Sequence, residues 1–537
     1  VKVKRNPVHA TTTDVNGKFM LQNVSEGDTL QVYFIGFNTA DIPLVKGKSD
    51  YGIILHSHMS QLDAVVVVGY STQRKVDLTG SVSSISSSTL ADRPITNATS
   101  ALAGLAAGLT VTNSGGSTPG YEAQSLLVRG QGTLNNAALV VVDGMTGVAI
   151  SDINPLDIDN ISVLKDAASS AIYGSRAANG VILITTKQGA ESAPRLTYSG
   201  NVSFETVAKR LNLVTDYAEF MELQNAGLIA NGQAPRFSQG KIDEWRNDAG
   251  RNPTIYPNTD WQDHIYRNPS VVQNHNLSVT GGGRRARYNI SFGYINNPGM
   301  IYYTDYERFQ LRTNIDENIK PWLSVGTNLF GYIDKNNPSS ENAAAGGDVI
   351  FGSGAFNTVP GMTLYDPVTG LYGGIQNPED ENVSNFNPYR RQWFYKDEFP
   401  TKTRRMVAKV YARLQPVKGL TIQGSYTYNY WDRRVEQHLT DRDLYRFTSD
   451  GPVLIREGKV RTYIRRYNYD NTFRSSELTA NYNFHVSKLE TSVLIGASQE
   501  YDRDRYEMFR RYDLIDDSLT SVDAATTNGE IQGNYTE

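Results

Sequence analysis

The chain has 537 residues, a formal net charge of −4 and a pI near 6.1, so its bulk charge gives no reason to expect nucleic-acid binding. This length is too great for one ordinary core and predicts two or more domains. Cysteine is absent, which excludes a disulfide framework and a thiolate metal site. There is no apolar run of about 18 residues, so an ordinary transmembrane helix is excluded. The chain begins at Val1 without a recognisable signal peptide, and we expect a missing segment before it.

Residues 1–60 have the pattern of a small β domain. A turn motif, Asp14-Val15-Asn16-Gly17, precedes alternating apolar positions such as Leu30, Val32 and Phe34. This pattern predicts part of a β-sandwich. The stretch DVNGKFMLQNVSEGDTLQVYFIGF resembles the carboxypeptidase D regulatory-like domain with its first strands cut away, and a generic adhesive β-module fits the pattern equally well.

A run of four valines marks the junction that follows, in residues 61–76. Residues 62–75 read LDAVVVVGYSTQRK, and β-branched residues in such a run favour an extended strand. An exposed strand can be bound by a partner through β-augmentation, in which main-chain hydrogen bonds supply the affinity. We therefore interpret the valines as a segment that a partner protein binds.

Residues 77–190 predict a compact α+β domain. ALAGLAAGL (101–109) is typical of a short helix, and SLLVRGQG (125–132) and ALVVVDG (138–144) are typical of strands that end in glycine turns. Residues 159–189 read as strand, helix and strand. In that segment Asp166 suits a helix N-terminus and Gly174 a left-handed position at its C-terminus.

From residue 191 to 537 apolar and polar residues alternate with a period of two, which predicts the first strands of an antiparallel transmembrane β-barrel. The clearest runs are Tyr288–Tyr294, Phe309–Ile315, Leu323–Gly331, Met406–Leu414, Leu420–Tyr430, Leu478–Val486 and Leu489–Ala497. Short and long connections alternate between them, as in a barrel with tight turns on one side and loops on the other. About nine strands are apparent by this pattern, with no closing strand, so we expect the barrel to be incomplete at this end.

Several of these segments together carry a family resemblance. DAVVVVGYSTQRKVDLTGSVSSI, SLLVRGQG, VVVDG, ISVLKDAASSAIYGSRAANGVILITTKQG and residues 258–300 resemble the SusC/RagA family of TonB-dependent outer-membrane transporters. The resemblance covers nearly the whole chain, as the N-terminal half of a full-length family member. Its departures are Ser71, where glycine is usual, and Ala137-Ala138, where proline-leucine is common.

This resemblance implies a plug domain at 77–190 inside a 22-stranded barrel in the outer membrane of a Bacteroidetes-like Gram-negative bacterium. It implies active import of an oligosaccharide, or of a peptide as in a documented minority. The implied partners are TonB with ExbB and ExbD, a SusD-like surface lipoprotein and the membrane lipid. The TonB box that TonB binds is then formed by Asp63, Ala64, Val65, Val66, Val67, Val68, Gly69 and Tyr70.

Two groups of residues are candidates for a role in the function. The first group lies in the plug, where polar residues beside glycines at strand ends either form an ion-pair or hydrogen-bond latch or are structural turn residues. This group comprises Arg129, Gly130, Asp143, Gly144, Lys165, Asp166, Tyr173 and Gly174. The second group is an aromatic loop that either contacts ligand or partner or forms an interfacial girdle: Phe386, Tyr389, Trp393, Phe394 and Tyr395.

The sequence shows no catalytic constellation. The motifs G-x-S-x-G, H-E-x-x-H and G-x-x-x-x-G-K-[ST] are absent, and the pair Asp260/Asp263 has a spacing that arises freely among 56 acidic residues. His56 and His58 have no further histidine nearby, so we expect no metal site, no cofactor and no enzyme activity. The alternatives from other classes are a non-transporting surface adhesin or glycan-binding protein and a secreted glycoside hydrolase.

Overall fold

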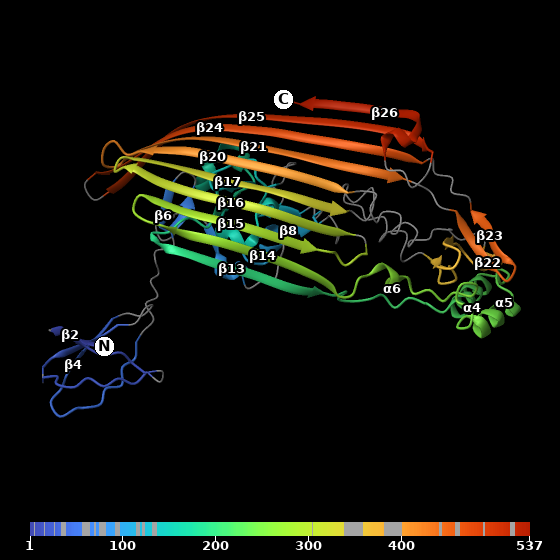
Figure 1. The fold of residues 1–537 in the computed structure, drawn as a ribbon, viewed down its shortest axis with the longest axis horizontal. Coiled ribbons are helices and arrows are strands. Elements are labelled where there is room, and N and C mark those ends of the chain that lie inside the picture. The colour runs from blue at the N-terminus through green and yellow to red at the C-terminus, as the bar shows by residue number, and fades with distance from the viewer. Residues whose placement is uncertain are drawn as a thin grey trace. The chain divides into compact units, whose positions relative to one another are not determined.

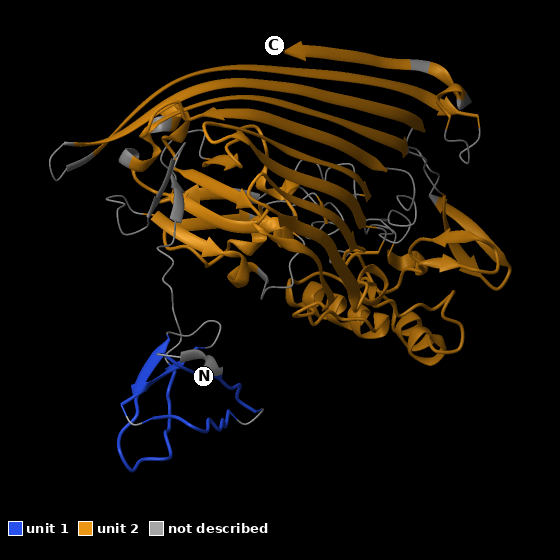
Figure 2. Ribbon diagram, turned by 60° about the vertical axis from the view of Figure 1, so that its left-hand side comes forward, with its two compact units in different colours: residues 1–79 blue, residues 80–537 orange. Residues whose placement is uncertain are grey.

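The computed structural model describes two compact units, Val1–Thr79 and Gly80–Glu537, each of which is treated by itself (Figure 2). The described residues are 1–4, 6–14, 17–25, 27–33, 39–55, 65–68, 71–74, 82–91, 97–113, 119–120, 124–130, 137–302, 304–337, 358–380, 400–439, 443–456, 462–486, 489–515 and 521–536. Within these ranges, every helix is too short or too polar to span a membrane.

The first unit contains a four-stranded antiparallel sheet with the order β2-β1-β3-β4. Its strands are β1 (Lys2–Val3), β2 (Asn6–Ala10), β3 (Thr29–Val32) and β4 (Ala40–Pro43). Leu30 and Val32 are buried, as their alternation predicts. The Asp14 carbonyl accepts a 3.0 Å bond from the Gly17 amide, and the positive φ of Gly17, 76°, closes this turn. The sheet is the part of the predicted sandwich that the described residues form.

The valine run forms a strand, as predicted. Strand β5 (Val65–Val68) pairs antiparallel with β6 (Ser71–Arg74) in a two-stranded sheet. One edge of β5 therefore bonds to β6 within this chain. Among the described residues no strand pairs with the other edge.

The α+β domain of the second unit contains a four-stranded sheet with the order β10-β12-β11-β7. The strands are β7 (Val82–Ser86), β10 (Leu139–Val142), β11 (Ile158–Leu164) and β12 (Val181–Thr186), and only β10 and β12 pair in parallel. The residues of β12 from Val181 to Ile184 are buried, because this strand is central and covered on both faces. A separate pair joins β8 (Leu109–Asn113) to β9 (Gln124–Val128).

Short helices connect these strands. They are α1 (Ser87–Ala91), α2 (Ala98–Ala101) and α3 (Ala167–Ser170), with 3₁₀ turns η2 (Ile150–Asp152), η3 (Pro155–Asp157) and η4 (Ala171–Ala177). The predicted helix at 101–109 is wrong. Helix α2 ends at Ala101, where the prediction begins, and the following residues form turns up to Leu109 of β8. Gly104 and Gly108 have φ values of 74° and 76°, which a right-handed helix cannot contain.

A ten-stranded antiparallel sheet forms the largest part of the second unit (Figure 1). Its strands follow one another in chain order: β13 (Ser192–Glu205), β14 (Ser270–Gly282), β15 (Ala286–Asn297), β16 (Asp305–Lys320), β17 (Leu323–Asn337), β20 (Thr401–Leu414), β21 (Leu420–Leu439), β24 (Tyr463–Val486), β25 (Leu489–Leu514) and β26 (Ala525–Thr536). The sheet has one strand more than the nine or so that the sequence predicts. The additional strand, β26, follows η8 (Val522–Ala524) and pairs with β25. Its alternation is weak, with Ile531 and Tyr535 as its large apolar residues.

Connections of unequal length alternate along this sheet, as predicted. The short connections are 283–285, 321–322, 415–419 and 487–488, and the long ones are 206–269, 298–304, 338–400, 440–462 and 515–524. Because each strand reverses direction, all the short turns lie at one end of the sheet and all the long connections at the other. The sheet thus has a turn end and a loop end.

The long connections build a lobe at the loop end that the sequence analysis treated only as links (Figure 1). It contains α4 (Tyr217–Ala230), α5 (Gln239–Asp248), α6 (Trp261–Ile265) and the 3₁₀ turn η7 (Pro378–Asp380). A small sheet of order β18-β19-β22-β23 adds β18 (Tyr365–Asp366), β19 (Leu371–Gly373), β22 (Leu444–Thr448) and β23 (Gly451–Arg456). Tyr217, Trp245 and Met362 belong to its own buried core.

Candidate functional site

The two faces of the ten-stranded sheet differ in polarity. One face carries exposed apolar side chains, among them Leu311, Met406 and Leu478. The other carries buried polar side chains, among them Asn276, Lys409 and Asn429. The polar face is the concave one, and the α+β domain packs against it (Figures 1 and 2). A soluble protein has the opposite arrangement, with apolar residues inside.

Asp143 lies at the centre of this contact. It follows β10 with a φ of 49°, a left-handed value that only a few per cent of non-glycine residues adopt. Its carboxylate accepts bonds from the amide and the hydroxyl of Thr186, at 2.9 and 2.8 Å. It also pairs with the Arg312 guanidinium of β16 at 3.1 Å, and both side chains are 4% exposed. The pair is therefore a buried ion pair between the domain and the sheet.

A second buried carboxylate, Asp152, lies in the turn η2. It pairs with Arg405 of β20 at 2.5 Å and accepts a 2.8 Å bond from the Tyr332 hydroxyl of β17. Arg308 of β16 donates to the main-chain oxygens of Ser151 and Asp152 and stacks over the Tyr332 ring at 4.0 Å. Asp152 is thus held by side chains from three strands of the sheet.

Hydrogen bonds from side-chain amides, and hydrogen bonds to main-chain oxygens, extend this contact between the domain and the sheet. The Asp157 carboxylate accepts from Asn276 at 2.9 Å and from Gln310 at 3.1 Å. The Lys409 ammonium donates to the main-chain oxygens of Asp143 and Gly144, at 3.0 and 3.1 Å. A Cβ added at Gly144 would lie 2.8 Å from this ammonium, and the φ of 72° also requires glycine. Most buried polar groups of the contact are paired, as a stable buried network requires, but Arg308 Nε and Gln310 Oε1 have no hydrogen-bond partner.

The contact has a more exposed part at Glu500 of β25. Its carboxylate pairs with Arg176 at 2.5 Å and accepts a 3.0 Å bond from Thr146. The Arg176 and Glu500 side chains are 46% and 26% exposed. Water reaches this pair, so its net strength is lower than that of the buried pairs.

The other predicted plug residues lie in turns, in a helix cap or in the buried core of the plug. Arg129 has a φ of 57°, its amide donates to the Gly108 carbonyl at 2.7 Å, and its side chain is exposed next to Gly130. Asp166 caps α3, accepting from the Ser169 amide at 2.9 Å, as predicted. Gly174 has the expected positive φ, 66°, at the kink that separates two helical segments within η4. Lys165 donates to Ser83 at 2.5 Å, and Tyr173 is buried.

Other predicted residues lie outside the described residues. These are Asp63, Ala64, Gly69, Tyr70, His56, His58, Phe386, Tyr389, Trp393, Phe394 and Tyr395, and for Val65–Val68 only the backbone is described. The pair Asp260/Asp263 has a structural explanation, because Asp260 caps α6 and both carboxylates pair with Arg210 at 3.0 and 2.7 Å. In the described part of the chain, no three metal-ligating side chains come together.

The partners of Asp143 and Asp152 are not predicted from the sequence. Arg312, Arg405 and Tyr332 lie far along the chain from these carboxylates, and only tertiary structure brings them together. A signal was available, since each of the two arginines stands in an alternating strand on the face opposite the apolar residues. A buried arginine in such a position requires hydrogen-bond acceptors, among which a carboxylate is the strongest.

Comparisons with known proteins agree with this arrangement. The family model described as the TonB-dependent receptor plug domain matches residues 74–181. The chain is 34% identical over 409 residues to the TonB-dependent receptor SusC of Bacteroides thetaiotaomicron, covering 72% of this chain and 38% of that one. It is 32% identical over 433 residues to the TonB-dependent receptor P3 of Formosa agariphila, covering 80% of this chain and 40% of that one.

A solved structure described as the RagAB peptide importer in the open-open state shares the fold, with a TM-score of 0.72 and 23% identity. The likeness covers 88% of this chain and 53% of that one. Each protein named in these comparisons is a receptor or an importer. The chain spans less than half the length of the two curated relatives.

Proposed function

Because the chain belongs to the SusC/RagA-type TonB-dependent receptors, we propose that it imports an oligosaccharide across the outer membrane by a TonB-driven movement of its plug. The observation that most strongly supports this function is the polar contact between the plug and the concave face of the sheet. A domain held in a barrel by paired polar groups blocks passage, and those pairs can be exchanged for water when the domain moves. The apolar outer face is the surface that meets lipid hydrocarbon.

Energy coupling is assigned to residues 63–70. The outer membrane holds no ATP, so the driving force has to reach the plug mechanically from a periplasmic partner, TonB with ExbB and ExbD. Strand β5 offers main-chain groups along the edge that β6 does not occupy. An adhesin or a glycan-binding protein has no use for such a strand beside a plug.

The loop end of the sheet is the end at which the ligand is proposed to enter. The lobe of α4, α5 and β22–β23 gives this end a folded surface, and we propose that a SusD-like lipoprotein covers the barrel there. The turn end then faces the periplasm, as short turns do in outer-membrane barrels.

The test changes the valine strand in the native full-length protein, in cells. Deleting 63–68, or replacing Val67 with proline, removes main-chain donors from the free edge of β5 and should abolish uptake while leaving ligand binding at the cell surface unchanged. Replacing the four valines with isoleucine keeps both strand propensity and main-chain groups, and should retain uptake. Uptake at the wild-type rate in the deletion would refute energy coupling through this segment.

The substrate class is tested in the same cells. Fluorescently labelled oligosaccharides from plant and algal polysaccharides are compared with a labelled tryptic digest of casein. The proposal expects accumulation of at least one oligosaccharide that depends on the valine strand. Accumulation of peptides alone would identify a peptide importer instead, and turnover of a polysaccharide by the purified protein would identify a hydrolase.

A further inference from the structure

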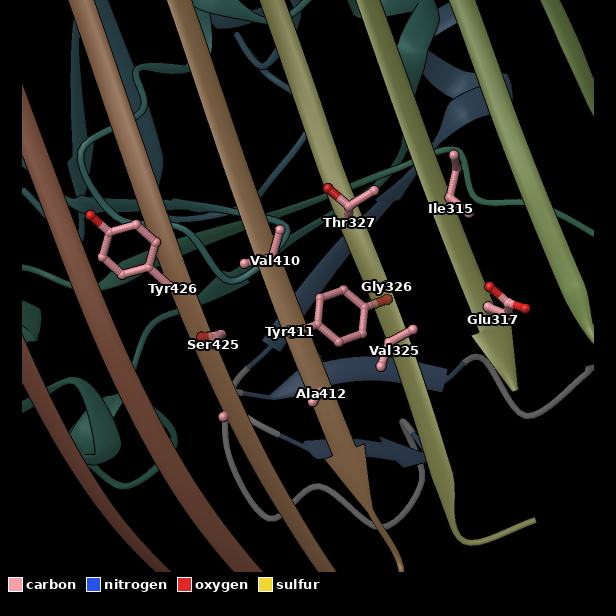
Figure 3. Close-up of a pocket in the computed structure, with 11 residues that line it drawn as sticks. Ile315, Glu317, Val325, Gly326, Thr327, Val410, Tyr411, Ala412, Ser425 and Tyr426 are labelled. Carbon is pink, nitrogen blue, oxygen red and sulfur yellow. The ribbon is translucent and has the colours of Figure 1, made fainter. Parts of the chain in front are cut away.

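An apolar groove of about 640 Å³ lies on the outer face of the sheet, on strands β16, β17, β20 and β21 (Figure 3). Two rows of cross-strand neighbours form it. The first row runs Ile315, Thr327, Val410 and Tyr426, and the second runs Glu317, Val325, Ala412 and Gly424. The residues in the middle of both rows are small, whereas Ile315 and Tyr426 at the ends of the first row are large. The groove is therefore a trough between two raised edges.

The side chains of this trough belong to the face opposite the plug. Val410 is 52% exposed, whereas its neighbour Lys409 is 5% exposed and bonds to the plug. The two rows contain two hydroxyls: that of Thr327 donates to the Lys409 carbonyl at 3.0 Å and is satisfied within the sheet, and that of Tyr426 lies at one end of the first row. The middle of the trough, between Ile315 and Tyr426, therefore offers an apolar surface without a free hydroxyl.

The position of the trough in the sheet indicates what kind of molecule binds there. It continues the exposed apolar face formed by residues such as Leu311, Leu329 and Met406, which under the proposed function lies in lipid hydrocarbon. It lies close to the turns 321–322 and 415–419, and so at the level of the inner leaflet. Glu317, at the rim, is exposed and has no ion-pair partner among the described residues. A carboxylate at this depth favours a cationic group.

We propose that this trough binds one acyl chain of a phospholipid of the inner leaflet and that Glu317 binds the ammonium of its headgroup. The inference rests on the proposed function, because it requires the outer face to lie in a membrane. It assigns a specific site on a surface that otherwise holds lipid in a fluid layer. A phospholipid with a primary ammonium, such as phosphatidylethanolamine, fits both parts of the site.

The experiment uses the native full-length protein in nanodiscs that contain an acyl-diazirine phosphatidylethanolamine or the matching phosphatidylglycerol. After photolysis, mass spectrometry locates the cross-linked peptides. The wild-type protein should cross-link mainly at the trough strands and more strongly with the ethanolamine lipid. Gly424→Leu should lower this yield about fivefold for both lipids, because the side chain fills the trough.

Two matched variants complete the test. A Cβ at Gly424 meets only Leu478 Cδ1, at 3.9 Å, so the filling variant has room to fold. Ala408→Leu places the same side chain on the same face of the sheet, on β20 outside the trough, and should leave the yield unchanged. Glu317→Gln should remove the preference for the ethanolamine lipid while keeping cross-links to both.

Cross-links spread evenly over the apolar face, or an unchanged yield in Gly424→Leu, would overturn the proposal. Failure of the valine-strand test with a normal cross-link pattern would overturn only the proposed import mechanism. The reverse result would overturn only the lipid site.

Discussion

The plug meets the sheet through two kinds of ion pair that differ in their exposure to water. Asp143 and Arg312 are almost fully buried, whereas Arg176 and Glu500 form a pair of similar chemistry at a partly exposed place. Breaking a buried pair leaves an uncompensated charge in a medium of low dielectric constant, but water replaces a lost partner at an exposed site. The stability of the plug in the barrel should therefore depend on the first region far more than on the second.

The largest effect is expected for Arg312→Ala. It leaves the Asp143 carboxylate buried without its cation, which should cost about 3–5 kcal/mol. The plug should loosen, and cells that carry the variant should become sensitive to vancomycin, a bulky antibiotic that the outer membrane normally excludes. Limited proteolysis of the purified protein should cut the plug earlier than in the wild type.

The double variant Asp143→Asn/Arg312→Ala provides the control, because asparagine tolerates the φ of 49° and still accepts a bond from Thr186. Removing both charges should restore much of the lost resistance to proteolysis, because no unpaired charge remains. Equal damage in the single and double variants would mean that packing, and not charge, explains the effect.

An intermediate loss of stability is expected for Tyr217→Phe in the lobe. There the hydroxyl of a tyrosine, and not a close cation, stabilises a buried carboxylate. In the lobe, Asp380 accepts a 2.7 Å bond from Tyr217, and Arg236 lies farther away at 3.6 Å. Burial raises the pKa of Asp380, and the bond from Tyr217 opposes this rise. Tyr217→Phe removes one hydrogen bond to a charged group and should destabilise the lobe by about 1.5–3 kcal/mol at neutral pH.

The pH dependence of this effect follows from the raised pKa. Because folded Asp380 binds a proton more readily than the unfolded chain does, the lobe gains stability as the pH falls through the folded pKa toward the ordinary value of 3.8. The cost of Tyr217→Phe should shrink when the carboxyl is protonated. Hydrogen exchange of α4 amides, measured near pH 7 and near pH 4, should show this difference, and an equal cost at both pH values would contradict it.

The smallest effect is expected for Glu500→Gln. The amide still accepts the bond from Thr146, and the lost pair with Arg176 is partly exposed, so the cost should be below about 1 kcal/mol. This cost should decline further in high salt. A loss of vancomycin resistance as great as that of Arg312→Ala would reverse the ranking of the two regions.

Local patterns in the sequence predict much of this architecture. The alternation in segments such as 406–414 and 420–430 predicts both the strands and the faces, because Lys409 and Asn429 are buried where the pattern places them. The cap at Asp166 and the buried strand at 181–186 are equally local features. Where glycines interrupt a small-residue run, at Gly104 and Gly108, the helix prediction fails.

The remaining features depend on contacts that no local pattern contains. The lobe was missed because its long connections were read only as links, although Asp216 and Ser238 are ordinary N-caps of α4 and α5. The partners of Asp143 and Asp152 could not be assigned, since the sequence shows that a strand has a polar face but not which domain covers it. Candidate residues such as Asp143 could be selected from the sequence, but their roles required the structure.

The unequal lengths of the strands have a consequence for the opening at the loop end. Strand β25 has 26 residues and β15 has 12, so their lengths are roughly 90 and 40 Å at about 3.4 Å per residue. The exposed aliphatic residues Val493, Leu494 and Ile495 of β25 lie near its turn, and its distal half carries charged side chains such as Arg505 and Glu507. Strand β25 therefore extends about twice as far as β15, and its distal half adds a tall hydrophilic wall at the loop end of the sheet.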